Sequence, residues 1–88
     1  MSFHLAADIQ VRKESWGLLF YRPAPHKLCF VRSGDWLYPA HFDGTWTYEA
    51  IVADVSRRTG SPPETIERSL PRLTARLVKN RVITNEVR

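Results

Sequence analysis

Cysteine is almost missing from this chain, which has one thiol, Cys29. An internal disulfide is therefore excluded, and so are a zinc finger held by cysteines and an iron–sulfur cluster bound by this chain alone. Such cysteine usage makes the cytoplasm the expected compartment. Long apolar runs are also missing, because the longest, residues 18–21, is far short of the about 20 residues that a membrane span needs. Residues 1–8 have no basic region followed by a long apolar one, so we expect no secretory signal.

Patterns that would indicate catalysis are scarce as well. The four glycines are isolated, so they form no phosphate-binding loop, and the three histidines have no metal-ligand spacing. Cys29 lies between Leu28 and Phe30 with no positive neighbour to activate it, which favours a packing role over a nucleophilic one. We therefore expect no bound cofactor and no enzymatic activity.

What remains is a small, basic, globular chain. Its 88 residues are enough for one domain, 1–88, and 43% of them are hydrophobic. There are 13 Lys and Arg against 9 Asp and Glu, a net charge of +4, and eight of the 13 basic residues fall in residues 45–88. This balance indicates an anionic partner without choosing between nucleic acid and an acidic peptide.

Three short strands are expected between about residues 9 and 32. Residues 9–12 alternate apolar and polar side chains, and residues 16–22 are rich in aromatic and aliphatic ones. Prolines in 23–26 predict a turn. The third strand, residues 27–32, would place Leu28 and Phe30 on one face and Cys29 and Val31 on the other. A three-stranded meander of this kind leaves an edge open.

Three helices are expected after the strands, at about residues 34–42, 47–59 and 62–80. Thr47 is the expected N-cap of the second helix, and Gly60 its end. A capping box that begins at Ser61 predicts the start of the third helix, and Pro71 predicts a bend or split near residues 67–70. Residues 82–84 would form a terminal extended segment. The expected fold is an α+β, winged-helix-like domain, with a three-stranded antiparallel sheet followed by three helices.

The third helix carries a stripe of arginines. Arg68, Arg72 and Arg76 recur every four residues, beside Leu73. Next to an open strand edge, this face suits an extended acidic peptide that adds as a fourth strand. The alternative is that the arginines are solvated or pair with Glu64 and Glu67. Three tryptophans are many for so small a core, so we expect one or two at a contact surface.

The stretch from Val11 to Tyr21 (VRKESWGLLFY), with residues 27–31 and 47–52 and the leucine-rich third helix, resembles the mycofactocin precursor peptide-binding family. That family belongs to the peptide chaperones of the pyrroloquinoline quinone biosynthesis protein D type, the RiPP recognition elements. The similarity covers about residues 9–83. The resemblance implies a chaperone that binds the leader segment of a ribosomally made precursor peptide and presents it to a radical SAM/SPASM maturation enzyme.

In this family the leader adds as a strand in a cleft between the third strand and the third helix. Carried onto this sequence, the peptide-binding residues would be Leu28, Cys29, Phe30, Val31 and Arg32 on the strand, and Arg68, Arg72, Leu73 and Arg76 on the helix.

Two other functions stay open. A winged-helix DNA-binding protein would use the third helix as its reading element, although Glu64 and Glu67 near its start, and the mild net charge, disfavour this. A purely structural subunit of a larger enzyme is the second. The open strand edge also invites strand exchange or an edge-to-edge homodimer.

Overall fold

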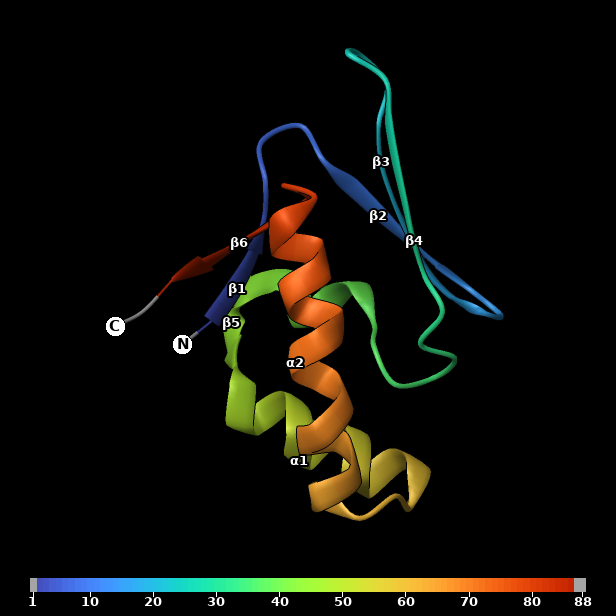
Figure 1. Cartoon of the computed structure of the whole chain (residues 1–88), viewed down its shortest axis with the longest axis vertical. Coiled ribbons are helices and arrows are strands. Elements are labelled where there is room, and N and C mark those ends of the chain that lie inside the picture. The colour runs from blue at the N-terminus through green and yellow to red at the C-terminus, as the bar shows by residue number, and fades with distance from the viewer. Residues whose placement is uncertain (1, 87–88) are drawn as a thin grey trace.

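The computed structural model describes residues 2–86 and contains two three-stranded antiparallel sheets and two α-helices. The first sheet has the order β2-β3-β4, with β2 at Gln10–Glu14, β3 at Gly17–Arg22 and β4 at Lys27–Val31. The second has the order β5-β1-β6, with β1 at Ser2–Leu5, β5 at Asp43–Thr47 and β6 at Ile83–Glu86. In the view of Figure 1 the two sheets lie on either side of α2 (Pro63–Lys79).

The predicted meander is confirmed as the sheet β2-β3-β4. Leu18 pairs with Val31 and Phe20 with Cys29, so these four buried side chains share the core face. The prediction of an extended segment near residues 82–84 is confirmed by β6. The second sheet was not expected, because β1 is four residues long and pairs with β5 and β6, which follow much later in the sequence.

Two of the three predicted helices are present. The second is α1, Tyr48–Thr59, and its N-cap is Thr47, whose side chain accepts from Ala50 N–H. The expected helix at about 34–42 is wrong: only the 3-10 helix η1, Pro39–Phe42, forms there. Pro39 has no N–H for the carbonyl of Asp35, and Arg58 binds the carbonyls of Asp35 and Trp36 instead, so no helix forms before η1.

The third predicted helix is α2, which begins at Pro63 after an N-cap at Pro62 that makes no side-chain cap bond, so the capping box at Ser61 is wrong. The expected split before Pro71 is also wrong, because α2 runs through it without interruption. Pro71 is exposed, and so is Glu67, whose carbonyl loses a helical donor there. Water can replace a donor lost at an exposed position, which makes the proline tolerable.

Aromatic rings join the two sheets into one core. Phe42 of η1 meets Phe20 of β3 edge-on, with ring centroids 5.4 Å apart, and lies 6.4 Å from the ring of Phe3 in β1. All three side chains are buried. These contacts therefore fix the position of the first sheet, with β4 at its edge, relative to the second sheet.

Candidate functional site at the edge of β4

Strand β4 is the last strand of its sheet. Within residues 2–86 no strand pairs with its outer edge, and the terminal strand β6 pairs with β1 in the other sheet. The opposite edge strand, β2, carries three consecutive charged residues at 12–14, which discourage strand pairing. β4 has one charge, Lys27, in its five residues. Its backbone edge is therefore the more receptive of the two.

The two faces of β4 differ sharply. Cys29 and Val31 are buried against the core, whereas Leu28 and Phe30 are 49% and 51% exposed on the outer face. This alternation confirms the sequence prediction. The four expected peptide-binding residues of the strand therefore do not line one surface. Cys29 and Val31 lie on the core face of the sheet, and Leu28 and Phe30 lie on the outer face. An exposed apolar pair on an open edge is a feature that proteins usually avoid unless a partner covers it.

Trp16 extends the outer apolar surface. Its ring packs on Phe30 with centroids 5.8 Å apart, and the residue is 38% exposed. Trp16, Phe30 and Arg32 line a cavity of about 400 Å³, here called the outer hollow. Trp16 is thus an exposed tryptophan, and its expected role at a contact surface stays a prediction.

A second cavity of about 400 Å³ lies between the end of β4 and α2, and is here called the helix-side hollow. It is lined by Arg32, Ser33, Trp36, Ser69, Arg72 and Leu73. Three of these, Arg32, Arg72 and Leu73, were expected from the sequence, and the structure brings them together. Arg68 and Arg76 are exposed on α2 and line neither hollow. Ser33, Trp36 and Ser69 were missed, because no sequence pattern connects the loop after β4 with α2.

Among the described residues, the arginines of this region have no acidic partner. Neither Glu64 nor Glu67 pairs with them, and within residues 2–86 no described carboxylate forms a salt bridge with Arg32, Arg68, Arg72 or Arg76. The alternative of pairing with the glutamates is therefore not observed. The Ser33 hydroxyl is buried and lacks a hydrogen-bond partner among the same residues. As far as residues 2–86 show, the helix-side hollow thus combines arginines without an acidic partner and a hydroxyl without a hydrogen-bond partner.

α2 follows β4 in the opposite direction. Asn80, directly after α2, lies 3.8 Å from Cys29 in the middle of β4, whereas Ser69 and Arg72 line the hollow at Arg32, beyond the end of β4. One helical face carries Ser69, Arg72, Leu73 and Asn80, given the period of 3.6 residues. The helix face therefore meets β4 at two places, at Cys29 and at the hollow beside Arg32.

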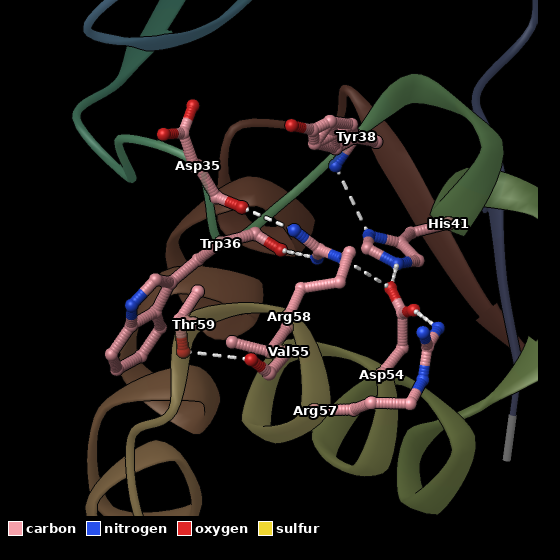
Figure 2. Close-up of polar contacts among 9 residues, drawn as sticks. All are labelled: Asp35, Trp36, Tyr38, His41, Asp54, Val55, Arg57, Arg58 and Thr59. Atoms are coloured by element: carbon pink, nitrogen blue, oxygen red, sulfur yellow. Dashed lines mark hydrogen bonds and ion pairs between the residues drawn. The ribbon is translucent and has the colours of Figure 1, made fainter.

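A polar network positions the loop that supplies Trp36 (Figure 2). Arg58 donates to the carbonyls of Asp35 and Trp36 at 2.6 and 2.7 Å, and Asp54 holds Arg58 at 2.9 Å. His41 Nδ1 accepts from Tyr38 N–H, so Nε2–H is the donor to Asp54, at 2.9 Å. The network ties α1 and η1 to the backbone beside the helix-side hollow.

The electrostatics of this network favour neutral His41 and ionised Asp54. Burial lowers the pKa of His41, which is 2% exposed, and outweighs the opposing effect of Asp54. Burial raises the pKa of Asp54, but hydrogen bonds from His41 and Arg58 reverse this and leave the pKa below its ordinary value. His41 and Asp54 therefore form a structural clamp in which the neutral imidazole donates its Nε2 proton to the carboxylate.

The largest cavity, about 590 Å³, lies on the other face of α2, against β1 and β6, and includes Phe3, Tyr48 and Val78 in its lining. Its charged lining residues are one acid, Glu49, and one base, Lys79. It therefore lacks the surplus of positive charge found at β4, so we favour β4 as the site in spite of its smaller hollows.

Within residues 2–86 no cluster of three or more potential metal ligands is found, and no described helix is long and apolar enough to cross a membrane. No protein-family model, curated protein or solved structure matches this chain.

Proposed function

We propose that this chain is a non-catalytic peptide-binding module that takes an extended peptide as an additional strand on the outer edge of β4. The winged-helix-like arrangement belongs to the same proposal, with η1, α1 and α2 standing for the three expected helices. In the terms of the resemblance, the peptide is the leader segment of a ribosomally made precursor, and the module presents it to a radical SAM/SPASM maturation enzyme in mycofactocin-type cofactor biosynthesis.

The observation that carries the proposal is the vacant, apolar edge of β4. Main-chain hydrogen bonds along such an edge supply affinity with few side-chain requirements. The exposed Leu28 and Phe30 offer apolar surface to the same guest, at about 25 cal/mol for each Å² buried. The unpaired arginines of α2 add long-range attraction, which raises association rates and favours acidic partners.

A display selection tests the proposal without knowledge of the ligand. A random nine-residue peptide library is selected on the wild-type protein, and the enriched peptides are then measured against proline substitutions at each of residues 28–31. Every second N–H of an edge strand points to the guest, so proline at those positions should leave the fold intact and abolish binding. The other positions should unfold the sheet, which circular dichroism detects.

Two outcomes would oppose this function. If folded proline variants at all tolerated positions bind the selected peptides as the wild type does, strand addition at β4 is wrong. If the selection enriches no peptide and random duplex DNA binds instead with a steep salt dependence, the chain is a nucleic-acid-binding domain.

A further inference from the structure

The two hollows at the end of β4 share one residue. Arg32 lines the helix-side hollow together with Arg72, and it lines the outer hollow together with Trp16 and Phe30. One hollow opens toward α2 and the other lies on the outer face of the sheet. A single guest strand beside β4 would therefore pass between two cavities of different chemistry.

The helix-side hollow has the composition of a carboxylate site. Arg32 and Arg72 come from different elements, and neither has a described carboxylate as a partner. Guanidinium groups bind carboxylates through paired N–H donors, and two such groups around one cavity repel each other less when an anion is present. The buried Ser33 hydroxyl, which has no partner in residues 2–86, is a further donor that a ligand oxygen would satisfy.

The outer hollow has the opposite character. Trp16 and Phe30 provide two tilted rings, 5.8 Å between centroids, and both remain exposed. An aromatic or large aliphatic side chain that packs there gains both burial and ring contacts. An acidic side chain of the guest would meet the negative faces of these rings and gain nothing from them.

Neighbouring residues of a strand point to opposite faces and are about 3.3 Å apart along the chain. Resting on the proposed strand addition, we infer that the end of β4 is a register-fixing site for two consecutive guest residues. The side-chain carboxylate of an acidic residue enters the helix-side hollow, and the adjacent apolar or aromatic side chain enters the outer hollow. Arg32 contacts both residues, so this pair fixes the register of the guest strand relative to β4.

A second copy of this chain suits the edge less well. An antiparallel pairing of two β4 strands would bring together two copies of residues 27–32, which carry Lys27 and Arg32 and no acidic residue, so the pairing would gain no charge attraction. An acidic guest has the complementary charge. We therefore assign the site to an acidic peptide.

The test uses two fluorescein-labelled octapeptides with blocked ends and the same composition. In the first, a glutamate and a phenylalanine are adjacent within a threonine- and valine-rich strand. In the second, one threonine separates them, so both side chains point to the same face. Fluorescence polarisation should show that the dissociation constant of the adjacent isomer is lower by about tenfold or more. Equal affinities for the two isomers overturn the inference.

Two further probes identify the source of the carboxylate. Glutamine in place of glutamate should cost about tenfold, because the guanidinium groups lose their charged partner. The same glutamine probe with a free C-terminus tests whether the carboxylate of a chain end replaces the side chain. Binding confined to that probe overturns the assignment to an acidic side chain.

Matched variants locate the contacts. Arg72→Gln should weaken the glutamate probe about tenfold and leave the glutamine probe unchanged, whereas Lys79→Gln, an equal charge change at an exposed residue of α2 that lines neither hollow, should alter neither. Phe30→Thr should weaken both probes about tenfold. Val78→Thr, at another exposed apolar residue, should not. If Val78→Thr weakens binding and Phe30→Thr does not, the guest lies in the largest cavity and the inference is wrong.

The proline variants of β4 separate this inference from the proposed function. If they abolish binding of every probe while Arg72→Gln and Phe30→Thr change nothing, strand addition stands and the register-fixing site is wrong. If none of the probes binds the wild type while peptides from the display selection do, strand addition stands and the register-fixing site is wrong.

Discussion

The side-chain amide of Asn80 lies 3.8 Å from Cys29 Sγ and links the end of α2 to the middle of β4 across 51 residues of sequence. Together with the helix-side hollow beyond Val31, this contact shows that α2 runs in the opposite direction to β4. The Cys29 side chain lies on the core face of β4, away from the backbone edge at which the guest strand would pair. The thiol therefore packs in the core and is not expected to contact the guest.

A change at Cys29 should accordingly affect stability and not recognition. Cys29→Ser puts a hydroxyl into an apolar, buried position and should lower the free energy of unfolding by about 1–3 kcal/mol. Urea denaturation measures this. Affinity for peptides from the display selection should stay within about twofold, measured well below the midpoint of unfolding. A large loss of affinity in the folded variant would place the thiol in direct contact with the guest.

Gly17, the first residue of β3, lies close to the backbone at the end of β4, and only glycine fits there. Its φ is +149°, and a Cβ atom would overlap the Val31 carbonyl and lie 2.7 Å from the Ser33 nitrogen. Gly17→Ala should therefore lower the free energy of unfolding by about 2–4 kcal/mol. Gly34→Ala is the control, since its φ of +54° carries strain but open space surrounds it, and should cost about 1 kcal/mol. Equal costs at the two glycines would contradict the close approach at Val31.

The clamp of His41 and Asp54 predicts a pH dependence of stability. The folded pKa of His41 lies below its ordinary value of 6.5, so the unfolded chain binds the proton more tightly. The free energy of unfolding should be constant above about pH 7 and fall as the pH decreases through 6.5 toward the folded pKa. Asp54 adds a second loss below its ordinary value of 3.8, because its folded pKa is also lowered.

His41→Gln removes the titrating imidazole while keeping an amide that can face Asp54. This variant should be less stable than the wild type at pH 8 and should lose most of the decline between pH 7 and pH 5. Urea denaturation at a series of pH values measures both effects. An unchanged slope in the variant would show that another group titrates in this range.

Unpaired arginines beside the site predict a moderate salt dependence. Binding of the adjacent glutamate–phenylalanine probe should weaken about threefold to tenfold between 0.05 and 0.3 M salt, because exposed charges are screened. The glutamine probe should be nearly insensitive. Equal salt slopes for the two probes would mean that the carboxylate does not meet the arginines.

The first sheet was predictable because its signals are local. The alternation of Leu28, Cys29, Phe30 and Val31 and the proline turn before it specify a strand with two unlike faces. β1 has no such signal: it is held by β5 and β6, so its pairing depends on contacts across the whole chain. The failed helix at residues 34–42 also has a tertiary cause, because Arg58 of α1 binds the carbonyls of Asp35 and Trp36, which a helix would have used internally.

The site was predictable in part. Arg72 and Leu73 follow from the helical period, and Arg32 from its place at the end of the expected strand, residues 27–32. Ser33 and Trp36 lie on a loop whose position depends on Arg58 and Asp54, which are distant in sequence. No local pattern predicts such a network, and this is why the helix-side hollow emerges only from the tertiary structure.

Backbone amide hydrogen exchange along β4 tests strand addition most directly. Measured by NMR with and without the adjacent glutamate–phenylalanine probe, amide exchange should slow at alternate residues of 27–31, because those N–H groups point to the guest and become hydrogen-bonded. The amides of β6, at the other open sheet, should not change. Slower exchange in β6 or α2 with β4 unaffected would contradict the account.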